Sequence, residues 1–202
     1  MDSDHDIQGA AQPQSRAYHH GDLRNALLDA ARAILEEESL SALTLRAVAR
    51  KAGVSHAAPY RHFPNHEALL VELSIEGFEA LREQVGVAGK ASATESDKIA
   101  TIGAAYMRFI AARPALSRLM FGGQLPNRDQ FTTLGQKADA IGEEIGEALH
   151  DHALGLAVWA AMHGLAMLVL ENVIDLGQRR SGLTVLPARS EIILRSLFAT
   201  RA

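Results

Sequence analysis

Residues 44–63 read TLRAVARKAGVSHAAPYRHF, and this stretch decides the fold. Thr44 stands where a helix N-cap belongs, and Gly53 follows the apolar-periodic residues as a turn former that tolerates positive φ. A further short helix is predicted over residues 55–62, with its first serine as the cap and with Pro59 removing one intrahelical bond near the start. The spacing therefore predicts two short helices joined by a tight turn, which is the pattern of a helix-turn-helix.

The sequence around this motif is basic, although the whole chain is not. Residues 39–66 hold no acidic side chain and four cationic ones, whereas the chain of 202 residues has a formal net charge of -4. The remainder therefore carries -4 - 4 = -8. Such asymmetry predicts a basic surface on an otherwise acidic protein, and this distribution of charge is typical of proteins that bind nucleic acids. Helix pairs with this spacing also occur in proteins that never contact DNA, so the spacing alone leaves a purely structural role open.

The composition favours packed helices over strands. Alanine (35) and leucine (26) fill 61 of 202 positions, and aromatic residues make up only 5%. These values predict an all-α protein of about nine helices. The absence of cysteine excludes disulfides, thiol nucleophiles and cysteine-based metal sites. Periodicity, caps and breakers predict helices at about 22–38, 44–52, 55–62, 66–85, 97–113, 115–120, 128–150, 151–177 and 189–200, with loops at 86–96 and 181–187.

The chain divides into three predicted regions. Residues 1–18 are polar and lack a signal-peptide core, which predicts a disordered arm and a cytoplasmic protein. Residues 19–66 form the helix-turn-helix domain, and 67–202 form a helical bundle. Residues 153–170 contain no formal charge, but the segment stands alone without cationic flanks. It is better explained as a helix buried on all sides in a bundle or dimer than as a membrane span.

With these motifs in view, the chain resembles the TetR/AcrR-type transcriptional regulators. The resemblance covers about fifty residues, from His20 to Leu70. A second resemblance, to the regulatory domain named for Trp, His and Gly, rests on Trp159, His163 and Gly164. The motifs that carry the first resemblance are Leu43-Thr44-Leu45-Arg46, Ala52-Gly53-Val54-Ser55, Tyr60-Arg61-His62-Phe63-Pro64-Asn65 and Glu67-Ala68-Leu69-Leu70.

The resemblance implies sequence-specific binding of double-stranded DNA. It places the third helix in the major groove and makes Arg46 the leading base reader, because an arginine fork suits guanine O6 and N7. Phe63 is interpreted as core packing. His66 departs from the lysine usual in the family, and its neutral imidazole would weaken a phosphate contact. The predicted DNA-binding residues are Thr44, Arg46, Ser55, His56, Ala57, Tyr60, Arg61, His62 and His66.

The rest of the chain is predicted to sense a small molecule and to form a homodimer. Trp159 and His163 lie four residues apart and share a helix face, where an apolar pocket could form, although plain core packing is the alternative for each residue. The resemblance implies that helices 151–177 and 189–200 pair across a two-fold axis, so that two reading helices meet a near-palindromic operator. The predicted ligand-binding residues are Met107, Ile110, Met120, Phe121, Trp159, His163 and Met167.

Two other functions remain open from the sequence. A sequence-tolerant DNA-coating protein without an effector would show no preferred operator. A small helical enzyme using His163 is the other alternative, but the nine histidines do not form a metal-binding spacing, and no phosphate loop or nucleophile elbow is present. We therefore expect no enzyme activity, no metal and no cofactor, and we expect a repressor released from its operator by an apolar or amphipathic effector.

Overall fold

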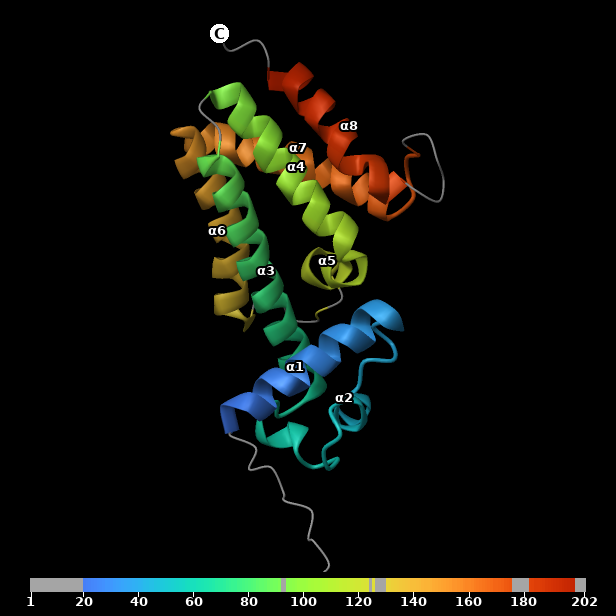
Figure 1. The fold of residues 1–202 in the computed structure, drawn as a ribbon. Helices are drawn as coiled ribbons and strands as arrows, with labels where there is room; N and C mark the ends of the chain where they lie inside the picture. Colours follow the sequence, from blue (N-terminus) through green and yellow to red (C-terminus); the bar gives the residue numbers. More distant parts are fainter. Residues whose placement is uncertain (1–19, 92–93, 124, 126–129, 176–181, 199–202) are drawn as a thin grey trace, which may run out of the picture.

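The computed structural model describes residues 20–91, 94–123, 125, 130–175 and 182–198. Within these ranges the chain is all-helical, with eight α-helices and one short 3₁₀ helix (Figure 1). The arm predicted at residues 1–18 lies outside the described residues. The elements are α1 (His20–Glu37), α2 (Leu45–Lys51), η1 (Pro59–Arg61), α3 (His66–Lys90), α4 (Glu95–Ala112), α5 (Pro114–Phe121), α6 (Thr132–Leu149), α7 (His152–Leu170) and α8 (Gly182–Phe198).

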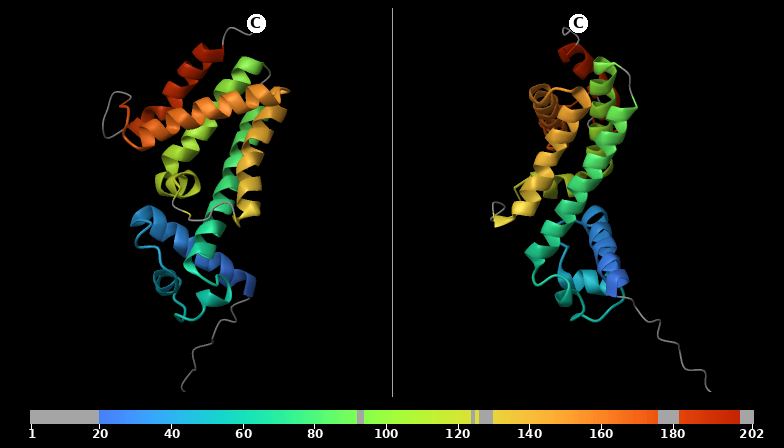
Figure 2. Two further views of the ribbon diagram at one scale, coloured as in Figure 1. Left: turned by 180° about the vertical axis from the view of Figure 1, so that it is seen from behind. Right: turned by 90° about the vertical axis from the view of Figure 1, so that its left-hand side faces the viewer.

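The elements form two groups joined by α3 (Figures 1 and 2). The N-terminal unit consists of α1, α2, η1 and the first half of α3. The helical body consists of the second half of α3 with α4 to α8. Leu27, Ile34, Val48 and Phe63 are buried in the N-terminal unit, so its small core excludes water. The packing of Phe63 confirms the interpretation of this residue as core.

Two predicted caps of the N-terminal unit, at Thr44 and Asn65, are confirmed, whereas the predicted cap at Ser55 is wrong, because the N-cap of η1 is Ala58. The Thr44 hydroxyl accepts a hydrogen bond from the Ala47 N–H at 3.1 Å, and the Asn65 side chain accepts one from the Ala68 N–H at 2.8 Å. Gly53 adopts a φ of 70°, in the left-handed region that favours glycine. These three residues act locally, which is why the sequence sufficed to locate the beginning of α2, the turn after it and the beginning of α3.

The α-helix predicted over residues 55–62 is wrong. The structure has a turn at residues 56–57 followed by the 3₁₀ helix η1. Pro59 has no N–H to bond the Ser55 carbonyl; instead the Ala58 N–H bonds that carbonyl at 3.0 Å. The His62 N–H likewise bonds Pro59 three residues back, at 3.0 Å. The tighter three-residue pattern replaces the predicted α-helix because Pro59 removes the first backbone bond that such a helix would form.

The loop predicted at residues 86–96 is also wrong, because α3 continues to Lys90. Its glycines serve close packing rather than chain reversal. A Cβ added to Gly89 would come within 2.8 Å of the Ala148 Cβ on α6, and one added to Gly86 would collide with the Glu144 carboxylate. Small residues therefore let α3 and α6 approach each other, and the next helix begins only after the Thr94 cap.

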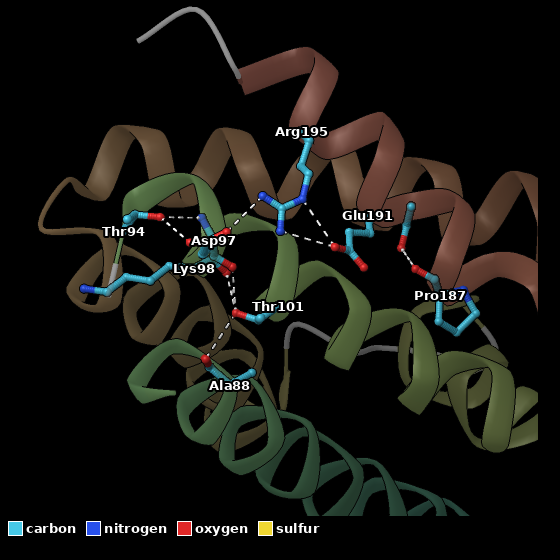
Figure 3. A network of polar contacts seen from close by, with 9 residues as sticks. Ala88, Thr94, Asp97, Lys98, Thr101, Pro187, Glu191 and Arg195 are labelled. Carbon is cyan, nitrogen blue, oxygen red and sulfur yellow. Dashed lines mark hydrogen bonds and ion pairs between the residues drawn. The ribbon is translucent and has the colours of Figure 1, made fainter. Parts of the chain in front are cut away.

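The body is built on the contact between α4 and α8, the most extensive helix pair in the structure (Figures 1 and 3). Arg195 of α8 donates to the Asp97 carboxylate of α4 at 3.0 Å and to Glu191 one turn earlier. The Thr94 hydroxyl and then Arg195 lower the pKa of Asp97, since both hydrogen bonds favour the carboxylate. Close packing beneath this network requires Gly103, because a Cβ there would collide with Leu194.

The C-terminal helices differ from the prediction at their ends. α6 begins at Thr132 rather than 128, and α7 ends at Leu170 rather than 177, where Glu171 to Asp175 turn away. The loop predicted at 181–187 is wrong over its described part, because α8 begins at Gly182 and contains Pro187. A proline near the beginning of a helix disrupts few backbone bonds, so the residue was misinterpreted as a breaker.

One face of α7 packs into the body and the other does not. Leu154, Val158 and Met162 are buried, whereas Leu156 is 59% exposed. The prediction of burial on all sides therefore does not hold within one chain. Among the described residues, α7 is the helix long and apolar enough to cross a bilayer, a property that core helices of soluble proteins share.

Candidate nucleic-acid interface and interior polar cluster

The predicted DNA-binding residues lie at one end of the molecule, on α2, η1 and the segments beside them (Figure 1). Their side chains are exposed, apart from His62, which is half-buried with its ring centroid 6.5 Å from that of Phe63. Tyr60 leaves 51% of its surface exposed. The exposed members of the set are Thr44, Arg46, Ser55, His56, Ala57, Tyr60, Arg61 and His66.

The turn between α2 and the exposed segment is held by backbone bonds. The Val54 N–H donates to the Ala49 carbonyl at 3.0 Å, and Val54 packs against the core. The small Ala49 is fully buried. These contacts keep Ser55 to Ala57 outside the core, where their side chains can approach a groove.

The cations of this surface are mostly uncompensated. Within the described part of the chain, Arg46, Arg50 and Arg61 have no carboxylate within ion-pair distance, whereas Lys51 pairs with Glu37 of α1 at 2.6 Å. The sequence indicated the charge of this stretch but not the pairing of Lys51, because its partner lies outside the motif. Three free arginines on one edge are suited to phosphate and base contacts.

A second cluster lies inside the body, where α4, α5 and α7 meet. The Tyr106 hydroxyl is 2.9 Å from His163 Nδ1. The Phe121 ring centroid lies 4.5 Å from that of His163 and 5.2 Å from that of Phe78, against which it packs edge to face. Tyr106 is not among the residues predicted from the sequence, because its partner His163 lies on another helix.

Burial determines the protonation of this pair. It raises the pKa of Tyr106 and lowers the pKa of His163, since both charged forms lose hydration. Both groups are therefore neutral, and the direction of the hydrogen bond between the phenol oxygen and Nδ1 follows from the imidazole tautomer. The Trp159 indole N–H lies near enough to Tyr106 to lower the phenol pKa slightly, but it forms no hydrogen bond of good geometry.

The predicted ligand-binding residues fall into two groups. Met107, Ile110 and Met120 have no exposed surface and belong to the core. Phe121, Trp159, His163 and Met167 are partly exposed and lie around that core. Among the described residues, no group of three histidine or acidic side chains is arranged to hold a metal ion.

Two comparisons of sequence identify the N-terminal motif. Residues 27–73 match the sequence model of the bacterial regulatory proteins of the tetR family. The transcriptional regulator BetI of Rhizobium meliloti (strain 1021), of the helix-turn-helix type, is 33% identical over 79 residues. Residues 27–73 belong to the TetR family of regulatory proteins. The match spans 39% of this chain and 39% of the length of BetI, so it covers well under two thirds of that curated relative.

Solved structures extend the likeness to the helical body. A protein of unknown function from Rhodococcus sp. RHA1 has a TM-score of 0.70 and 30% identity, covering 90% of this chain and 98% of that one. FadR from Bacillus subtilis, solved with stearoyl-CoA, has a TM-score of 0.62 and 17% identity, covering 84% and 96% of the two chains. The second likeness shows a shared fold.

The family match bears on the functions left open by the sequence. The proteins of this family are regulatory proteins, which supports a regulator over the catalytic alternative at His163. The helix-turn-helix that the family model covers contains the exposed edge with Arg46 and Arg61.

Proposed function

We propose that this protein is a homodimeric, sequence-specific DNA-binding transcriptional regulator, a repressor whose DNA affinity falls when a small apolar or amphipathic effector binds. The observation that carries the proposal is the exposed basic edge of α2 and η1 in a TetR-family helix-turn-helix. Such an edge can enter the major groove, where base pairs are distinguishable. A regulator of this kind works in the cytoplasm, and residues 19–66 and 67–202 serve as its DNA-binding and regulatory domains.

In this proposal, some side chains of the exposed edge contact bases and others contact phosphates. Arg46 reads guanine, while Ser55, His56 and Ala57 meet base edges at the beginning of the exposed segment. Tyr60, Arg61, His62 and His66 join Thr44 in contacting phosphates and so fix the register of the protein on DNA. The Thr44 hydroxyl still has a lone pair for this contact after it caps α2.

The dimer in this proposal uses the outer faces of α7 and α8. Large apolar side chains stand exposed on both helices, which is costly for a single chain in water. Two copies that bring these faces together would form a four-helix bundle. The exposed apolar residues are Leu156, Leu168, Ile192 and Leu197.

Operator selection tests the DNA-binding proposal. Random duplex DNA bound by the purified protein should enrich a near-palindrome whose half-sites are about 10 base pairs apart, or a multiple of that. Its affinity for the enriched sequence should exceed that for random DNA by at least about 1,000-fold. Binding without enrichment would favour the sequence-tolerant alternative, and no binding at low salt would refute the proposal.

The effector site is proposed at the interior cluster. Met107 and Met120 belong to the same apolar core as Tyr106, and Met167 packs against that core. Tyr106 and His163 add a polar pair, and an amphipathic ligand needs both kinds of surface. The other proposed contacts come from Ile110, Phe121 and Trp159.

The binding of a small molecule at the proposed effector site can be measured as a rise in the Tm of the protein. A panel of amphipathic probes should include stearoyl-CoA, the ligand of the FadR structure. A bound probe at 100-fold its Kd should raise the Tm by about 5 to 10 °C and release the selected DNA. Trp159→Ala should abolish the shift, and Val87→Ala, an exposed position on α3, should keep it. Equal shifts in both variants would place the site elsewhere.

A further inference from the structure

The short helix α5 is bonded at its N-terminal end to the N-terminal unit. The Glu36 carboxylate of α1 accepts hydrogen bonds from the Leu116 N–H at 2.9 Å and the Ala115 N–H at 3.3 Å. No side chain of the residue before α5 caps it. The first turn of a helix has free N–H groups and favours negative charge, so Glu36 supplies a cap from another part of the chain.

The other half of α5 is bonded to the body. Arg118 donates to the Leu170 carbonyl at 2.6 Å and to the Glu171 carboxylate at 2.9 Å, which satisfies the C-terminal end of α7. Phe121 ends α5 against the His163 ring. One helix of eight residues therefore connects α1 with the terminus of α7 (Figure 1).

Among the described residues, α3 itself also connects the two groups. Arg24 pairs with Glu72 at 2.5 Å and Arg32 pairs with Glu76, so α1 is fastened to the first half of α3. A single continuous helix does not prevent the N-terminal unit from bending or twisting relative to the body. A second attachment away from the axis of α3 prevents this bending and twisting. In the described part of the chain, α5 provides such an attachment.

We propose that Glu36 is a positioning residue, which sets the orientation of the N-terminal unit by capping α5. It touches no DNA in this role; it acts through α5 and the Arg118 attachment to α7. The inference rests on the proposed function, because the orientation of the exposed edge matters for a dimer that meets two half-sites. Loss of the cap lets the exposed edge of α2 and η1 adopt orientations in which the two copies of the edge in a dimer no longer match the two half-sites.

Spin-label distances test the orientation without DNA. The chain has no cysteine, so spin labels attach only to cysteines that are introduced. The labelled protein carries Ser41→Cys in the N-terminal unit and Gln136→Cys on α6. Dilution with unlabelled protein leaves one labelled chain per dimer. The labelled parent should give a narrow distance distribution, Glu36→Ala should at least double its width, and Glu36→Gln, which keeps one oxygen acceptor, should lie between them.

Glu38→Ala is the matched control, since it removes an exposed carboxylate two residues away. It should leave the distribution unchanged. Glu36→Ala should also weaken binding to selected DNA about fivefold, as expected for a lost cap, without altering the preferred bases. A parent-like width in both Glu36 variants, with helicity intact, would overturn the positioning role. Failure of the parent to bind DNA would count against the proposed function alone.

Discussion

Replacing Leu156 and Ile192 together with glutamate should convert the protein to a monomer and lower its affinity for selected DNA by at least about 100-fold. These side chains are 59% and 68% exposed in one chain, on the outer faces of α7 and α8. In a dimer built on these faces each glutamate would be buried beside its symmetry mate, and unpaired buried charge is costly. A monomer presents one reading edge where the operator offers two half-sites.

Light scattering and operator binding measure the two effects. Val87→Glu is the matched control, because Val87 is 65% exposed on α3 and lies outside the proposed interface. It should remain dimeric and bind DNA like the parent. A double variant that keeps the dimer mass would show that the outer faces of α7 and α8 are not the interface.

Replacing Arg46 with alanine should remove the preference for one base pair in each half-site and weaken operator binding by roughly 10- to 100-fold. The guanidinium is exposed and free of any carboxylate among the described residues, so its donors are available to a guanine. A bidentate contact of this kind discriminates among bases, whereas a phosphate contact does not.

Arg50→Ala provides the comparison from the same helix. Arg50 lies in the last turn of α2 and is also exposed. As a phosphate contact, its loss should weaken binding to all sequences alike and reduce the salt dependence by about one ion. Selection from random DNA separates the two outcomes. If Arg46→Ala behaves like Arg50→Ala, Arg46 positions the protein and reads no base.

The sequence predicted the parts of the fold that depend on neighbouring residues. Thr44, Asn65 and Gly53 control helix ends through bonds within three residues or through their own φ, so their roles were visible in the motif. Pro59 was visible too, but the strength of its effect was underestimated. It turned the expected α-helix into a 3₁₀ segment.

Contacts between distant segments were out of reach of the sequence. The loop predicted at 86–96 failed because only the proximity of α6 shows that Gly86 and Gly89 are packing residues. The partner of His163 is 57 residues away, and the cap supplied by Glu36 is 80 residues from Leu116. Periodicity marked Met107, Ile110 and Met120 as apolar, but it could not show that they are fully buried in this structure.

The uninterrupted α3 also acts as a lever arm. Its 25 residues, at about 1.5 Å each, make a rod of about 37 Å that carries the N-terminal unit at one end. A tilt of the whole helix by about 5° about its C-terminal end would displace its N-terminal end by about 3 Å, close to the rise of one base pair in B-DNA. An angular change too small to disturb helix packing would therefore be enough to put the two halves of a dimer out of phase with their operator.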